Sequence, residues 1–228
     1  MQQRLGVSLF VFFLCFGFSL FARILVEQMV EDVVEHLEKL HVLVVGPGLG
    51  RCPMVLEAAA QIIEQAKSRN LPIVLDADAL FLLTLEPHQS LLKDYDKAIM
   101  TPNAMEWKRL AGLEHFWSKA TVVRKGKEDS ITVNGQVLGT CAEVGGWKRS
   151  GGLGDILAGT LGTLVAWNHI LTQQSKASID DLPLACWTAC CLTKRATKRA
   201  YDKHLRSMTA PDVLSELGST INEMTGPP

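Results

Sequence analysis

The sequence carries no excess of charge of either sign. Its 228 residues include 23 basic and 24 acidic side chains, and the formal net charge is -1. Proteins that bind nucleic acids usually present a surplus of lysine and arginine, so this balance gives no electrostatic reason to expect a nucleic-acid partner. Any site for an anion must therefore be built locally, by a few residues.

Spacings typical of metal sites and disulfide scaffolds are also missing. The six cysteines form no C-x-x-C pair, and the six histidines show neither metal-ligand spacing nor a paired nucleophile. We therefore expect no metal ion held by a dedicated set of protein ligands, and we interpret the cysteines as reduced structural thiols.

A long uncharged run stands near the beginning of the chain, where residues 5–22 are rich in Phe and Leu. Such a run resembles a signal-peptide core or a short membrane anchor, and the alternative is a buried strand or helix. We predict a hydrophobic leader over residues 1–24, which would contact a membrane or direct the chain to the secretory pathway. One domain over residues 25–228 would follow.

The rest of the chain alternates short apolar runs with longer amphipathic ones, without repeats, which is typical of serial βα units. Hydrophobic spacing predicts helices over residues 30–40, 54–66, 106–110, 155–167 and 184–201, and another after Pro211. Short apolar runs, β-branched at residues 42–45, predict strands over residues 42–45, 73–75, 97–100, 120–124, 130–133 and 137–138, with a hairpin turn at Asn134-Gly135. The predicted fold is α/β, with three α/β/α layers, a mainly parallel central sheet and a small antiparallel hairpin annex.

The strongest local signal is Arg149-Ser150-Gly151-Gly152-Leu153-Gly154-Asp155, which precedes a long apolar helix. Glycines let the backbone approach a ligand closely, and amide groups at a helix N-terminus attract anions. Asp155 is placed to accept a proton from a hydroxyl that attacks a γ-phosphoryl group, while the glycine amides stabilise the developing charge. The alternative is a plain loop with an acid that interacts favourably with the helix dipole.

Four further motifs follow predicted strands or connect them. Gly46-Pro47-Gly48-Leu49-Gly50 ends the first strand, but no third glycine completes a G-x-G-x-x-G pattern, so NAD as a redox cofactor is disfavoured. Asp76-Ala77-Asp78 and Thr101-Pro102-Asn103 stand where the next two strands end. Lys125-Gly126-Lys127-Glu128-Asp129 lies between two strands, and its alternative interpretation is an exposed charged turn.

In order along the chain, the motifs GPGLG, DAD, TPN with a following Glu, KG with a following Asp, and GGxGD resemble those of the NAD(P)H-hydrate dehydratase family, within the ribokinase-like superfamily. The resemblance extends from about Leu25 to the C-terminus. It implies a ribokinase-like fold and the dehydration of hydrated NADH or NADPH, driven by ATP with Mg²⁺ and releasing ADP and phosphate. This reaction repairs damaged nicotinamide nucleotides.

The resemblance also implies roles for individual positions. Asp155 would be the catalytic base, and Gly152 and Gly154 would belong to the anion hole. The positions implied to bind ATP are Lys125, Gly126, Lys127, Glu128, Asp129, Gly145, Gly146, Trp147, Lys148, Arg149, Ser150, Gly151, Gly152, Leu153 and Gly154. The positions implied to bind the hydrated nicotinamide dinucleotide are Gly48, Asn103, Ala104, Met105, Glu106, Trp107, Lys108, Arg109 and Asp155.

The chain departs from the family pattern at several places. Trp107 stands where Phe is usual, Leu153 replaces a polar residue, and Gly146-Trp147-Lys148 makes the approach loop bulkier. The family also carries a glycine-containing strand and helix before the segment that matches Leu25, which we expect this chain to lack. A sheet without that strand would expose an edge, and we therefore expect low solubility or pairing with a second copy.

Two alternatives to a dehydratase share these residues. A ribokinase-like small-molecule kinase, for a vitamin or a thiazole, would use Asp155 and its glycines but stop at the phosphorylated product. A truncated, non-catalytic variant would bind nucleotide without turnover. The resemblance implies a cytoplasmic or mitochondrial protein, whereas residues 5–22 favour the secretory pathway or a membrane tether.

Overall fold

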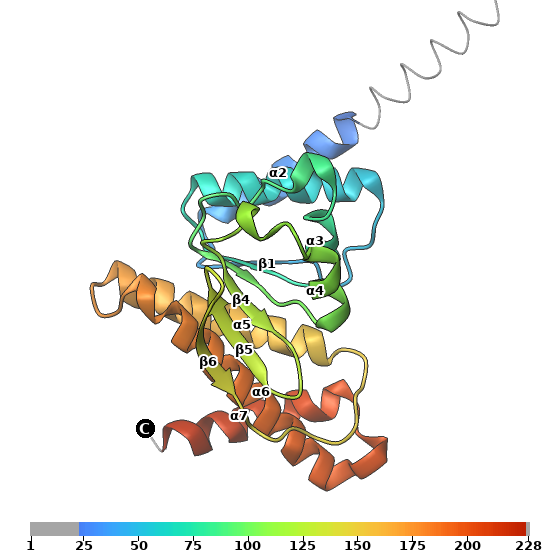
Figure 1. Cartoon of the computed structure of the whole chain (residues 1–228), viewed down its shortest axis with the longest axis vertical. Helices are drawn as coiled ribbons and strands as arrows, with labels where there is room; N and C mark the ends of the chain where they lie inside the picture. The colour runs from blue at the N-terminus through green and yellow to red at the C-terminus, as the bar shows by residue number, and fades with distance from the viewer. Residues whose placement is uncertain (1–22, 227–228) are drawn as a thin grey trace, which may run out of the picture.

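In the computed structural model, which describes residues 23–226, a six-stranded sheet is flanked by helices (Figure 1). The strands are β1 (Leu43–Val45), β2 (Ile73–Leu75), β3 (Ala98–Met100), β4 (Thr121–Arg124), β5 (Asp129–Val133) and β6 (Gln136–Cys141). A helix over residues 23–37 precedes β1. The helices that follow are α2 (Pro53–Ser68), α3 (Asp78–Leu82), α4 (Ala104–Leu110), α5 (Leu153–Gln173), α6 (Leu182–His204) and α7 (Ala210–Thr225). Short 3₁₀ turns span Glu86–His88, Glu114–Phe116, Ile179–Asp181 and Leu205–Ser207.

The strands lie in the sheet in the order in which they occur in the chain, from β1 to β6. β1 to β4 are parallel, whereas β5 is antiparallel to both β4 and β6. β2 and β3 are buried along their whole length, as expected for parallel strands covered on both faces. The predicted mainly parallel sheet with an antiparallel annex is confirmed.

The two faces of the sheet belong to different hydrophobic cores, because successive side chains of a strand point in opposite directions. Ile73 and Leu75 of β2 pack in the core that α2 and α3 complete, whereas Val74 packs with residues of α5 and α6. In Figure 1, α2, α3 and α4 lie on one side of the sheet, and α5, α6 and α7 lie on the other. The predicted three-layer α/β/α architecture is therefore confirmed.

The annex is a hairpin that turns at Asn134 and Gly135, as predicted. The φ angles of these residues are 50° and 74°. A two-residue turn of type I′ requires positive φ at both positions, which asparagine and glycine adopt more easily than other residues. Local turn chemistry thus fixes the pairing of β5 with β6.

Helix boundaries differ from the prediction in places. α4 begins at Ala104 rather than Glu106, because the Asn103 side chain caps it and accepts hydrogen bonds from the amides of Met105 and Glu106. The helix predicted over residues 155–167 extends as α5 from Leu153 to Gln173. The prediction has no counterpart of α3, whose five residues are too few to show a helical period.

Residues 5–22 of the predicted leader lie outside the described part of the chain. Within residues 23–226, no helix is both long and apolar enough to cross a membrane. The five cysteines in this part are free thiols. The division into a leader and one domain stays a prediction, as does the expected lack of a strand and helix before Leu25.

Candidate active site

Three of the predicted motifs meet at one edge of the sheet, because parallel strands end on the same side. Asp76 follows β2, Asn103 lies just beyond β3, and Lys125 follows β4 directly. The Lys125 amide donates a hydrogen bond to the Pro102 carbonyl oxygen, with an N–O distance of 2.9 Å. Polar residues that are far apart in sequence thereby gather at the carboxyl ends of the strands.

Lys125 and Asp76 form an ion pair at this edge. Lys125 Nζ lies 2.6 Å from Asp76 Oδ1 and 3.9 Å from Glu106 Oε2. The Asp76 side chain is 3% exposed and the Lys125 side chain 21%. The pair is thus largely shielded from water, and a short charge-assisted hydrogen bond is strong in such surroundings.

The glycine turn that begins α5 lies against this ion pair. Gly152 has a φ of 88°, and a Cβ there would lie 2.9 Å from Ala210 Cβ. A Cβ at Gly154 would lie 3.5 Å from Asp76 Oδ2 and 3.9 Å from Lys125 Nζ. An anion at this turn would therefore meet the N-terminal amides of α5 and the ammonium group of Lys125 together.

A cavity of about 520 Å³ opens beside the turn and the ion pair. Several residues with implied ligand-binding roles line it: Asn103, Ala104, Lys125, Gly126, Asp129, Arg149, Ser150, Leu153 and Gly154. Residues without an implied role complete the lining: Leu157, Cys190, Thr193 and Lys194. The lining holds more lysine and arginine than acid, which favours an anionic ligand.

The loop from Lys125 to Asp129 is fastened to α6. The Gly126 amide donates to Asp129 Oδ1 at 2.9 Å. Lys194 Nζ lies 3.3 Å from Asp129 Oδ2 and donates to the Lys127 carbonyl oxygen at 2.6 Å. Burial raises the pKa of Asp129, and the Gly126 amide and Lys194 partly oppose that rise. Because Asp129 is buried, the exposed-turn interpretation is wrong at this residue.

The loop that leads into the glycine turn packs against α6. A Cβ at Gly146 would lie 2.8 Å from the Thr197 carbonyl oxygen and 2.8 Å from Tyr201 Cβ, so only glycine allows this approach. Trp147 is 83% exposed at the tip of the loop. The remaining implied ATP positions that do not line the cavity are Lys127, Glu128, Gly145, Lys148, Gly151 and Gly152.

Asp155 faces a different space from Gly154. Its exposed side chain lies at an apolar groove of about 430 Å³, which Ile156 and Thr163 of α5 form together with Leu217 of α7. The first turn of α5 therefore separates this groove from the cavity that Gly154 lines. The Asp155 carboxylate still lies close to the turn, because a Cβ at Gly152 would be 4.0 Å from Asp155 Oδ2.

The positions implied to bind the dinucleotide are not all at the cavity. Asn103 and Ala104 line it, and Glu106 accepts a hydrogen bond from the Asn103 amide at 2.8 Å, which completes the cap of α4. Trp107 packs edge-to-face against Trp117, with ring centroids 5.8 Å apart, so it serves the hydrophobic core. Met105, Lys108 and Arg109 are exposed, as are Asn103 and Ala104, but the first three do not line the cavity.

Gly48 lies in the exposed turn after β1, with a φ of 68° and open space where a Cβ would be. Asp78 fixes this turn, because its carboxylate accepts a hydrogen bond from the Gly50 amide at 3.1 Å and pairs with Arg51 at 2.9 Å. The two acids of the DAD motif thus act separately. Asp76 pairs with Lys125, and Asp78 orders the glycine-rich turn.

Asp76 and Lys194 are candidate functional residues to which sequence reasoning gave no role. Asp76 belongs to a motif that the sequence singled out, but its partner Lys125 is on another strand. Lys194 and Cys190 of α6 are four residues apart, on one face of the helix, and both line the cavity. Nothing within α6 itself indicates that this face borders a site.

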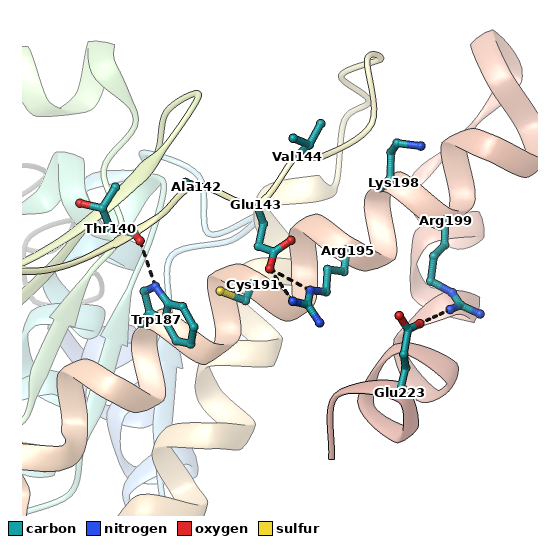
Figure 2. Close-up of a pocket in the computed structure, with 10 residues that line it drawn as sticks. All are labelled: Thr140, Ala142, Glu143, Val144, Trp187, Cys191, Arg195, Lys198, Arg199 and Glu223. Carbon is teal, nitrogen blue, oxygen red and sulfur yellow. Dashed lines mark hydrogen bonds and ion pairs between the residues drawn. The ribbon is translucent and has the colours of Figure 1, made fainter. Parts of the chain in front are cut away.

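A larger cavity, of about 750 Å³, lies between the end of β6, α6 and α7 (Figure 2). Its arginines already have acidic partners: Arg195 donates two hydrogen bonds to Glu143, and Arg199 pairs with Glu223 at 2.5 Å. An anion there would have to compete with these carboxylates. Lys125 and Lys194 of the smaller cavity are paired with acids as well, but this cavity also adjoins the N-terminal amides of α5, so it is the better site for a phosphate group.

The layered sheet, the glycine turn at the N-terminus of α5 and the carboxylate within that turn define a ribokinase-like α/β protein. The sequence profile of the NAD(P)H-hydrate dehydratase family matches residues 18–218. The chain belongs to this family.

Relatives with established names agree. The chain is 37% identical over 213 residues to the ATP-dependent (S)-NAD(P)H-hydrate dehydratase of Mus musculus, covering 86% of this chain and 61% of the relative. It is 36% identical to the Homo sapiens protein of the same name, covering 86% and 60%. The Dictyostelium discoideum protein of that name is 37% identical, covering 85% and 70%. The chain thus spans about three fifths of the length of the mouse and human relatives.

Solved structures share the fold. A hypothetical protein from Streptococcus mutans superposes with a TM-score of 0.66 at 22% identity, covering 86% of this chain and 70% of that one. The ADP/ATP-dependent NAD(P)H-hydrate dehydratase from Bacillus subtilis, co-crystallised with ATP/Mg²⁺, superposes with a TM-score of 0.57 at 19% identity, covering 80% and 64%. At these identities the likeness concerns the fold alone.

Proposed function

We propose that this chain catalyses the ATP-dependent dehydration of (S)-hydrated NADH or NADPH to NADH or NADPH, with release of ADP and phosphate. The family and the names of the relatives support this reaction. The observation that carries the proposal is the turn at the start of α5, which places the Gly154 backbone against the ion pair of Lys125 and Asp76, with Asp155 next in sequence. Charge stabilisation and proton removal then occur at one turn.

In the proposed mechanism, the Asp155 carboxylate takes the proton of the substrate hydroxyl group while that oxygen attacks the terminal phosphorus of ATP. The bond between this phosphorus and ADP breaks, and the amides of residues 152–154 with the Lys125 ammonium group stabilise the negative charge. The phosphorylated substrate then loses phosphate, which takes the hydroxyl oxygen with it. A proton leaves the neighbouring carbon, and the ring double bond forms again.

The cavity fits the phosphates of ATP, because Lys125, Arg149 and Lys194 line it beside the N-terminus of α5. Mg²⁺ that binds through nucleotide phosphates needs only one or two protein carboxylates. Such a need suits residues 23–226, which contain no group of three or more His, Cys, Asp or Glu side chains arranged to hold a metal. We expect Glu106 to face the magnesium ion. The ion would neutralise part of the negative charge of the phosphates.

The first test is the recovery of reduced-nicotinamide absorbance from hydrated NADPH with ATP and Mg²⁺. The unchanged chain should restore the absorbance, and Asp155→Asn should lower the rate by about 10²–10⁴-fold while ATP still binds in calorimetry. Asp202→Asn is the matched control, because Asp202 is an exposed acid of α6 whose partner is Lys198. A full rate in Asp155→Asn would contradict the assigned base.

Measuring the products of the same reaction mixture distinguishes the alternatives. A phosphorylated product that accumulates without inorganic phosphate would identify a small-molecule kinase. ATP binding with neither product nor phosphate would identify a non-catalytic, nucleotide-binding variant. Stoichiometric release of ADP, phosphate and reduced nicotinamide is the outcome that the proposal requires.

We further propose that residues 5–22 bring the chain to a membrane, as a secretory signal or a tether, because this uncharged run is rich in Phe and Leu. Cell fractionation of the full chain beside a form that begins at residue 23 tests this. Both forms in the cytosolic or mitochondrial matrix fraction would contradict the proposal and favour the compartments that the family resemblance implies.

A further inference from the structure

Asp76 is a charged group in an unusual place. It follows a fully buried strand, and its side chain is only 3% exposed. A buried carboxylate is costly unless it is paired, and even a well-made buried ion pair seldom stabilises a fold more than apolar residues would. The pair of Asp76 and Lys125 is therefore poorly explained by stability alone.

The backbone of Asp76 is fixed by its neighbours. The Asp76 amide donates to the Val45 carbonyl oxygen at 3.0 Å, and its own carbonyl oxygen accepts from the Ala79 amide at 3.0 Å. Gly46 packs so closely on that carbonyl oxygen that a Cβ would lie 1.7 Å from it. The backbone that carries the carboxylate is thus fixed by the end of β1 and by the start of α3.

Lys125 connects this fixed acid with the cavity. Its Nζ donates to Asp76 Oδ1 at 2.6 Å, while the residue itself lines the cavity beside Gly154. The nearby Glu106 is 3.9 Å away and already accepts a hydrogen bond from the Asn103 amide. Without the Asp76 charge, no ion pair of this length would fix the Lys125 ammonium group in place.

We propose that Asp76 is a positioning residue: through Lys125, it holds a positive charge at the glycine turn of α5, where the terminal phosphates of the nucleotide bind. The inference rests on the ATP-binding part of the proposed function and adds a residue to it. Asp76 does not touch the nucleotide. Its charge sets where the Lys125 ammonium group points.

The test compares nucleotides that differ in their phosphates. Calorimetry with Mg²⁺ measures the affinities of the full chain and of Asp76→Asn for ATP and AMP. We expect Asp76→Asn to weaken ATP binding about tenfold or more, the size of a lost hydrogen bond between charged groups, and to change AMP binding less than about twofold. Equal loss for both nucleotides, or no loss, would overturn the inference.

Further variants guard against a folding defect. The double variant Asp76→Asn/Lys125→Met should bind ATP as weakly as Lys125→Met alone does, because Asp76 acts only through Lys125. The double variant buries no unpaired charge and remains a test if either single variant melts early. Additive losses in the double variant would show that Asp76 acts independently, and Asp76→Glu should recover part of the ATP affinity.

The outcome is separable from that of the dehydratase assay. A selective loss of ATP affinity in Asp76→Asn, with no recovery of NADPH by the unchanged chain, would keep the positioning role and refute the reaction. Recovery of NADPH by a chain whose ATP affinity does not depend on Asp76 would support the reaction and refute the positioning role. If the unchanged chain binds no ATP, both ideas fail.

Discussion

Gly46 and Asp76 approach each other more closely than any side chain at position 46 would allow. A Cβ at Gly46 would lie 1.7 Å from the Asp76 carbonyl oxygen and 2.9 Å from Ala79 Cβ, and the φ of Gly46 is 120°. Neither the space nor the backbone angle suits an L-residue. The first glycine of the GPGLG motif therefore lets the ends of β1 and β2 pack closely together, next to the acid that positions Lys125.

Gly46→Ala should destabilise the fold by more than about 3 kcal/mol, because the clash and the strained backbone add to each other. Gly48→Ala is the matched control in the same motif. Its φ of 68° is left-handed, but the space around it is open, so we expect a cost of about 1–2 kcal/mol. Urea unfolding of both variants measures the difference, and equal losses would show that the close approach to Asp76 does not matter.

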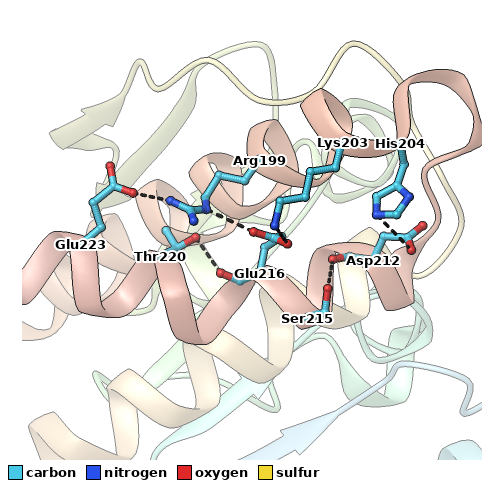
Figure 3. Close-up of polar contacts among 8 residues, drawn as sticks. All are labelled: Arg199, Lys203, His204, Asp212, Ser215, Glu216, Thr220 and Glu223. Atoms are coloured by element: carbon cyan, nitrogen blue, oxygen red, sulfur yellow. Dashed lines mark hydrogen bonds and ion pairs between the residues drawn. The ribbon is translucent and has the colours of Figure 1, made fainter.

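At the scale of elements, α6 and α7 are joined by a buried acid that two bases share. Glu216 of α7 is 5% exposed, and it pairs with Arg199 at 3.2 Å and with Lys203 at 2.6 Å (Figure 3). These hydrogen bonds hold the pKa of Glu216 below its ordinary value of 4.5. α6 also carries Lys194, so this link helps to keep the cavity wall in place.

A depressed pKa makes the stabilising contribution of Glu216 depend on pH. The contribution is fully present above the ordinary value of 4.5, and it is lost as the pH falls through the lower pKa of the folded state. Glu216→Gln should therefore lower Tm at pH 7, and the difference from the unchanged chain should shrink at acidic pH. Thermal melts across this range test it.

Glu223→Gln is the control for this pair. Glu223 also binds Arg199, but its side chain is 59% exposed, and exposed ion pairs contribute little. We expect a Tm close to that of the unchanged chain at every pH. A Glu216→Gln difference that persists unchanged in acid would mean that packing, rather than the ion pair, explains the loss.

At the scale of the whole molecule, the sheet ends in β6, which has β5 as its one partner within residues 23–226. Val137 and Leu138 of β6 are 58% and 51% exposed. An edge strand with unpaired backbone groups and exposed apolar side chains favours pairing with another chain. We expect concentration-dependent association of two copies through β6.

Leu138→Lys should weaken this association, because a charge on an edge strand opposes pairing. Leu214→Lys is the matched control, since Leu214 is 60% exposed on α7, away from the sheet edge. Sedimentation equilibrium over a range of concentrations distinguishes the two variants. A monomeric unchanged chain, or equal effects of both substitutions, would contradict association through β6.

Much of the fold could be predicted because its determinants are local. The strand Ile73–Leu75, the turn at Asn134-Gly135 and the order of the strand-end motifs depend on apolar runs and on turn residues that lie next to each other in the chain. For the same reason the glycine turn before α5 was evident from the sequence. Helix α3 could not be predicted from the sequence, since its five residues make fewer than two helical turns.

The chain by itself thus determined the strands, the helices and the motifs, because periodicity and turn chemistry act over a few residues. Only the tertiary structure decided which of those motifs touch. The pair of Asp76 with Lys125 depends on parallel strands ending at one edge, and the place of Lys194 depends on how α6 packs on the sheet. Packing also decided that Trp107 contacts Trp117 in the core and that Asp155 lies at the groove. The contacts that orient a side chain come from segments distant in sequence.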